Sequence, residues 1–70
     1  MSPIQRARVV LSAYAASSFP EGELANDPET VISDLFADLL LYCEKNNLDY
    51  ERCKQRGETH AVAELSGGEE

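Results

Sequence analysis

The stretch that decides the fold is DPETVISDLFADLLLYCEKNN, residues 27–47. Asp27 is a good helix N-cap, and Pro28 suits the first position of a helix. The two asparagines at 46–47 tolerate the left-handed conformation that ends helices. Between them, apolar side chains recur at three- and four-residue spacing, which predicts a helix over 28–46. Its core face is expected to carry Ile32, Leu35, Phe36, Leu39, Tyr42 and Cys43, with Leu35, Phe36 and Leu39 buried.

A second helix is predicted over residues 3–18, upstream of that stretch. Ser2 can cap it, and Gln5 completes a capping-box pattern with Ser2. The helix is expected to end before Phe19, because a residue that precedes a proline is pushed out of the α region.

A third helix is predicted over residues 50–64, with Asp49 as its cap. Gly57 lies in its middle and costs about 1 kcal/mol relative to alanine, unless it lets another backbone come close. The inner face of this helix is expected to hold Tyr50, Cys53, Gly57 and Ala61.

These elements predict an all-α fold, a small three-helix domain over residues 1–65. The second and third helices would form a hairpin through 46–49, with the first helix packed across them. Residues 20–27 are expected to be a polar loop, and residues 66–70 a flexible acidic tail.

Composition narrows the possible functions. The 70 residues include six Lys and Arg and thirteen Asp and Glu, which gives a net charge of −7. An acidic chain argues against binding to nucleic acid or to an anionic membrane, since both need concentrated positive charge. No apolar run approaches the length of a membrane span, and no secretory signal is evident. The sequence therefore predicts a cytoplasmic protein.

Catalytic and metal-binding patterns are missing from the sequence. His60, the one histidine, follows Cys53 by seven residues, about 10.5 Å along a helix, too far for a shared metal or hydrogen bond. We expect no enzyme activity, no cofactor and no metal. Cys43 and Cys53 are expected to be reduced core residues, and a disulfide between them is the alternative.

The candidate partner-binding residues are Asp34, Asp38 and Leu41. Their spacing places two carboxylates and one leucine on the polar side of the 28–46 helix. Charge is also segregated along the chain, since residues 1–20 carry +2 and residues 21–70 carry −9. Such a face suits a partner with a basic surface, although a solvated ridge with one stray leucine is the alternative.

Three short pieces of sequence carry a family resemblance. They are SDLFADLLLYC at 33–43, LDY at 48–50 and His60. Together they resemble small uncharacterised proteins encoded by bacterial phages, prophages and plasmids. The usual aromatic residue after the histidine is replaced here by Ala61. The resemblance covers residues 31–64 and implies a mobile-element origin, without an assigned activity.

These observations lead to one leading function and two alternatives. The leading interpretation is a non-enzymatic protein-binding module that antagonises a host defence system, in the manner of an anti-CRISPR protein. One alternative is an antitoxin-like or accessory regulatory factor. The other is a homodimeric structural domain with no foreign partner. Size, charge and resemblance support these classes by association.

Overall fold

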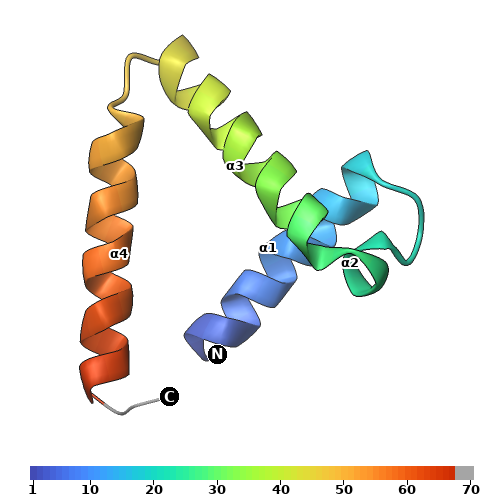
Figure 1. Ribbon diagram of the computed structural model, residues 1–70, viewed down its shortest axis with the longest axis horizontal. Coiled ribbons are helices and arrows are strands. Elements are labelled where there is room, and N and C mark those ends of the chain that lie inside the picture. The colour runs from blue at the N-terminus through green and yellow to red at the C-terminus, as the bar shows by residue number, and fades with distance from the viewer. Residues whose placement is uncertain (68–70) are drawn as a thin grey trace. The chain divides into compact units, whose positions relative to one another are not determined.

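The computed structural model describes residues 1–67 of the chain. It contains four helices, α1 (Pro3–Ser18), α2 (Glu23–Asn26), α3 (Pro28–Lys45) and α4 (Tyr50–Gly67), and no strand in the described residues (Figure 1). The all-α class predicted from the sequence is confirmed. The short helix α2 occupies part of the stretch 20–27 that the sequence predicts to be a loop. The sequence does not reveal this helix, because four residues are too few to produce a periodic apolar pattern.

The positions where α1 begins and ends are set by the residues next to them in the sequence. The Ser2 N–H donates to Gln5 Oε1 at 2.9 Å, and the Gln5 N–H donates to Ser2 Oγ at 3.2 Å. This reciprocal pair satisfies two backbone donors at the start of the helix. At the other end, Phe19 is extended (φ −133°, ψ 160°) before Pro20, so the helix ends at Ser18 as predicted.

Carboxylate caps begin both α3 and α4. Asp27 accepts the backbone N–H of Thr30 at 3.3 Å and its hydroxyl at 2.7 Å. Asp49 accepts the backbone N–H of Arg52 at 3.0 Å. These bonds satisfy N–H groups that have no partner inside the helix, and both predicted caps are therefore confirmed.

The connection between α3 and α4 is a left-handed turn. Asn47 has a φ of 58°, and the Leu48 N–H donates to the carbonyl of Cys43 at 2.8 Å. The Asn46 side chain also donates to the Tyr42 carbonyl at 2.9 Å. The last carbonyls of α3 are thus satisfied as the two asparagines predict.

Helix α4 is longer than expected. It runs on to Gly67 rather than ending at 64, so it includes the start of the predicted tail, and residues 68–70 lie outside the described residues. A Cβ placed on Gly57 would have nothing within 4 Å, so no backbone approaches this glycine. Gly57 therefore lowers the stability of α4 without a packing role.

The contacts of the chain form two compact units, Met1–Asp38 and Leu39–Glu70. Helix α3 is continuous and contributes residues to both. Each unit is described separately below. The single domain predicted over 1–65 stays a prediction.

The core of the first unit is small and includes a polar clamp. Ala15 of α1 is 8% exposed, and Val31 of α3 is completely buried. Next to Ala15, the Tyr14 hydroxyl donates to Asp38 Oδ2 at 2.5 Å, which joins α1 to α3. The rings of Tyr14 and Phe19 meet edge to face at a centroid distance of 6.3 Å.

The buried side of α3 in this unit is not the predicted one. Leu35 is half-buried, but Phe36 is 49% exposed and Leu39, across the unit boundary, is 43% exposed. Consecutive helical residues differ by about 100° in direction, so the side bearing Val31 is well separated from the side bearing Phe36. Asp38 follows Val31 by seven residues and so lies on the same side of α3, and its carboxylate accepts the Tyr14 hydroxyl of α1.

The second unit has still less core. Cys43 is buried at 8% exposure, and Tyr50 at the start of α4 is half-buried. The rest of the predicted inner face of α4 is exposed, since Cys53 and Ala61 both lie open to solvent. That expectation was wrong because no large apolar side chain of α3 covers this face.

Candidate protein-binding surface

The three residues predicted to bind a partner all belong to α3 and are all exposed. Asp34 and Asp38 are one turn apart in the first unit, and Leu41 belongs to the second unit. Leu41 is 64% exposed, so it is free for contact with another molecule. The role of the three residues in binding a partner stays a prediction.

Asp38 also forms a hydrogen bond within the first unit. Its carboxylate accepts the Tyr14 hydroxyl, and this bond, together with desolvation, raises the pKa of Tyr14 to about 12. The charges of Asp38 and Asp34 add to the increase in the Tyr14 pKa, because a negative neighbour disfavours a phenolate. Asp38 therefore holds the helices together, whereas the structure gives Asp34 no hydrogen-bond partner among residues 1–67.

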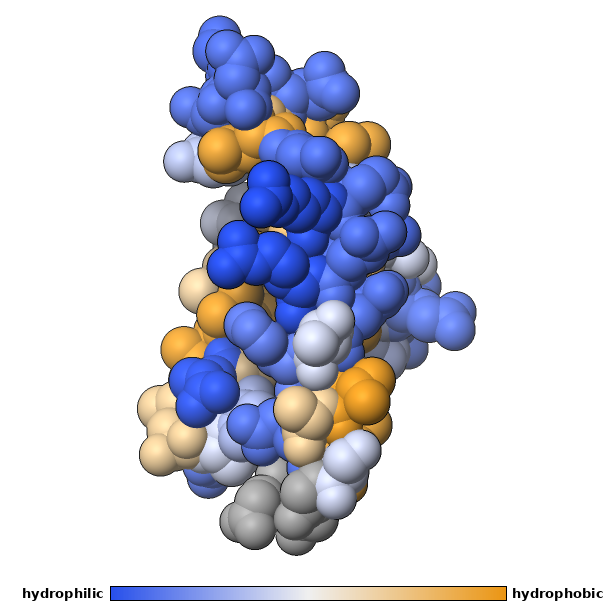
Figure 2. Space-filling model, turned by 90° about the vertical axis from the view of Figure 1, so that its left-hand side faces the viewer, coloured by the Kyte–Doolittle hydropathy of each residue, from blue (hydrophilic) through white to orange (hydrophobic). Residues whose placement is uncertain are grey.

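Large apolar side chains are exposed in the part of α3 that belongs to the second unit. The run from Leu39 to Tyr42 has exposures of 43%, 42%, 64% and 64%, in chain order. On the face drawn in Figure 2, apolar (orange) patches are separated by hydrophilic surface. Single exposed leucines are common, but three consecutive leucines followed by a tyrosine point to every side of a helix and cannot all be covered by one neighbouring helix. We call these four residues, Leu39–Tyr42, the apolar run.

Sequence reasoning placed Tyr42 on the core face and therefore missed it as a surface residue. The signal was present in the sequence, since a run of four large apolar residues covers every side of a helix. At least one of them must face away from any one packing partner.

The two cysteines differ in their surroundings. Both are free thiols, Cys43 buried and Cys53 exposed. Burial raises the pKa of Cys43, and the nearby Cys53 adds to the increase. The expectation that both cysteines are core residues is thus correct for Cys43 and wrong for Cys53.

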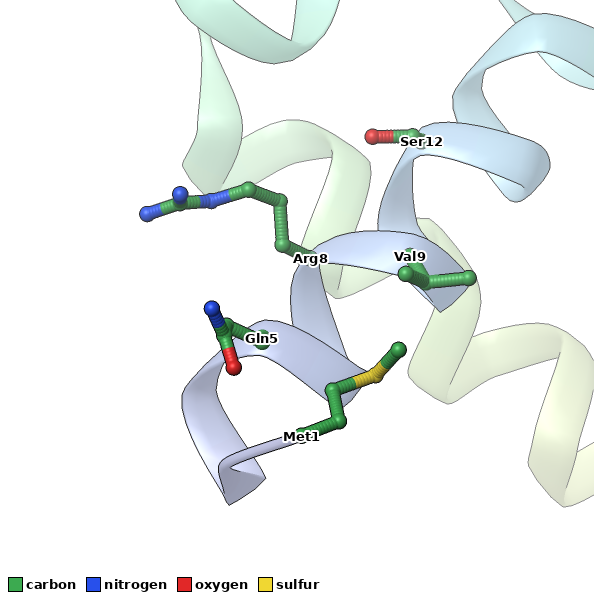
Figure 3. A pocket seen from close by; sticks show the side chains of 5 residues that line it. All are labelled: Met1, Gln5, Arg8, Val9 and Ser12. Atoms are coloured by element: carbon green, nitrogen blue, oxygen red, sulfur yellow. The ribbon is translucent and has the colours of Figure 1, made fainter. Parts of the chain in front are cut away.

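Two open hollows lie in the first unit. One, of about 610 Å³, is lined by one side of α1 and by Met1 (Figure 3). The other, of about 440 Å³, lies between α1 and α2 and is lined mainly by small residues such as Ala15 and Ala25.

In residues 1–67 no three His, Cys, Asp or Glu side chains lie close enough to hold a metal ion. Helices of the length and apolar content required to span a membrane are likewise missing from these residues.

Comparison of the chain with family models, with curated proteins and with solved structures found no match.

Proposed function

We propose that this chain is a non-enzymatic protein-binding module that uses α3 to bind a partner with a basic surface. The observation that carries the proposal is the apolar run, whose Leu41 and Tyr42 are each 64% exposed. Large apolar and aromatic side chains of this kind provide most of the binding energy at protein interfaces.

Charge supports a basic partner. The chain carries −7, and α3 itself contributes exposed carboxylates at Glu29, Asp34 and Glu44. Opposite charge accelerates association and orients the partner, while the apolar run supplies the area that is removed from water.

We further propose that the partner belongs to a bacterial defence system and that the chain inhibits it, as anti-CRISPR proteins do. Support comes from the acidic charge and the resemblance of residues 31–64 to phage and plasmid proteins. CRISPR effectors hold nucleic acid in positively charged channels, which an acidic protein can occupy.

The test is target-DNA cleavage by a panel of purified CRISPR effector complexes, with and without the chain. We expect inhibition of at least one effector, and we expect Leu41→Ser to raise the concentration needed by at least about tenfold, as for a central interface residue. Val10→Ser is the matched control, because Val10 is 54% exposed but lies on α1.

Unimpaired cleavage across the panel would contradict the anti-CRISPR-like function. Equal loss of inhibition in Leu41→Ser and Val10→Ser would contradict the assignment of the binding surface to α3. Both variants should keep their helices because neither residue is buried, and circular dichroism checks this.

A further inference from the structure

The two cysteines of the chain lie on either side of the turn that joins α3 to α4. Cys43 lies in the last turn of α3, and Cys53 lies in the first turn of α4. Both belong to the same compact unit, Leu39–Glu70. Both are free thiols in this structure, so the pair is in its reduced form. We call these two residues the thiol pair.

Backbone hydrogen bonds hold each cysteine against this turn. The carbonyl of Cys43 accepts the Leu48 N–H at 2.8 Å, and the Cys53 N–H donates to the carbonyl of Asp49 at 3.0 Å. Leu48 and Asp49 are consecutive, so two hydrogen bonds and one peptide bond connect the two cysteines. The left-handed conformation of Asn47, with a φ of 58°, reverses the chain between them. Local backbone chemistry therefore keeps the thiol pair together.

The side chains of the pair also interact. Burial raises the pKa of the Cys43 thiol, and the Cys53 side chain raises it further, through its charge and through side-chain hydrogen bonding. Hydrogen bonding acts only over a few ångströms, so the two sulfur atoms lie close to one another. Close approach of the two side chains is the main geometric requirement for a disulfide.

The two thiols differ in their access to solvent. Cys53 is exposed, whereas Cys43 is 8% exposed. A small oxidant therefore meets Cys53 first, while Cys43 is shielded and stays protonated. An accessible thiol beside a second thiol that can displace the oxidised product is the arrangement found at redox-sensitive cysteines.

We infer that the thiol pair is a modification site for peroxides, at which oxidation forms a reversible disulfide across the α3–α4 turn. The Cys53 thiolate attacks one oxygen of hydrogen peroxide and becomes a sulfenic acid, and the other oxygen leaves as hydroxide, which takes up the Cys53 proton to form water. The Cys43 sulfur then attacks the Cys53 sulfur, and the sulfenic hydroxyl leaves with the Cys43 proton as a second water. The two thiols lose two electrons, and the peroxide gains them.

The disulfide adds a covalent link to the unit that has the smaller core. Cys43 is the one buried residue among residues 39–67, so the α3–α4 turn has little packing to keep it closed. A disulfide removes open conformations from the unfolded chain. The thiol pair includes none of the α3 residues named in the proposed function, so each proposal can fail without the other.

The first test is oxidation of the reduced full chain by hydrogen peroxide, followed by intact-mass measurement and titration of free thiols. We expect the mass of a single chain to fall by that of two hydrogens, with both thiols lost together, and dithiothreitol to restore both. Cys53→Ser should make the oxidation of Cys43 at least about tenfold slower, because Cys43 is shielded. Cys43→Ala should instead give oxygen adducts of Cys53 or a disulfide between two chains. Loss of both thiols of the unmodified chain as oxygen adducts, or as disulfides between chains, overturns the proposal.

The second test is the equilibrium of the thiol pair with reduced and oxidised glutathione, measured in buffer and in concentrated urea. We expect the folded chain to favour the disulfide at least about tenfold more than the unfolded chain, because the fold holds the thiols together. The matched control moves the thiol of α4 by one position with Cys53→Ser and Lys54→Cys, which turns it by about 100° around the helix. This variant should lose the tenfold preference, and circular dichroism checks that its helices remain. Equal disulfide formation in buffer and in urea overturns the proposal, as does an undiminished preference in the displaced variant.

Discussion

The two units of the chain are stabilised in different ways. Met1–Asp38 contains a fully buried valine and a hydrogen bond between side chains that are 24 residues apart. Leu39–Gly67 contains one buried residue, Cys43, and is ordered mainly by its helix cap and by the turn at Asn47. The first unit therefore depends on tertiary contacts and the second on local backbone chemistry.

This difference indicates where the molecule meets others. Both units leave large apolar side chains exposed, but at most two of them are consecutive in the first unit, whereas four are consecutive in the second. The second unit leaves the apolar run and the residues Val62 and Leu65 exposed, and its own core does not use them. Its surface is the part of the chain with the most to gain from association.

The largest expected effect comes from removing the core of the first unit. Val31→Ala should lower the free energy of unfolding by about 2–3 kcal/mol, because Val31 is completely buried and its loss leaves a cavity. Urea unfolding followed by circular dichroism measures this change. So large a loss is a considerable fraction of the stability of a small domain.

Ile32→Ala is the control for that experiment. Ile32 is adjacent in sequence but 37% exposed, so its removal should cost less than half as much as that of Val31. A larger loss for Ile32→Ala than for Val31→Ala would show that the apolar face predicted from the sequence is the buried one after all.

In the second unit we expect a smaller change in the free energy of unfolding, and this change should be an increase. Gly57→Ala should stabilise the chain by about 1 kcal/mol, because alanine is the better helix former and its Cβ meets nothing within 4 Å. Thermal unfolding followed by circular dichroism measures the shift, which should be an increase in Tm.

Gly22→Ala is the matched control, since Gly22 lies in the first unit with a φ of 89°. Alanine in this left-handed conformation should destabilise the chain by about 1–2 kcal/mol. A decrease in Tm for Gly57→Ala would mean that another backbone does approach Gly57 in solution.

The sequence predicted the parts of the fold that depend on neighbouring residues. Capping at Ser2, Asp27 and Asp49 and the ends of the helices at Phe19 and Asn47 all follow from side chains within a few positions. The one-turn helix α2 was missed because its start depends on the φ of Gly22, which leaves no periodic signal.

The buried face of α3 could not be predicted in the same way. A helical wheel ranks the faces of a helix by apolar content and so selects Phe36 and Leu39. The buried face instead carries Val31 and, seven residues later, Asp38, which accepts the Tyr14 hydroxyl of α1. A contact between residues 14 and 38 has no local signature in a single sequence. The exposure of Leu41 on α3 did follow from the wheel, since this residue lies away from the apolar arc.

The smallest expected effect concerns the Tyr14–Asp38 hydrogen bond, the contact that distinguishes the first unit. The pKa of Tyr14 is raised from 10.0 to about 12, so the folded state favours the protonated phenol. The stabilisation from this shift is complete below pH 10 and is lost as the pH rises from 10 to 12. Ultraviolet absorbance of the phenolate should therefore still increase near pH 12, and Tyr14→Phe should remove this late increase.

Asp38→Asn should lower the pKa of Tyr14, because the amide carries no negative charge. A late increase that persists in Tyr14→Phe would assign it to another tyrosine, and circular dichroism in the same samples shows whether the helices remain folded.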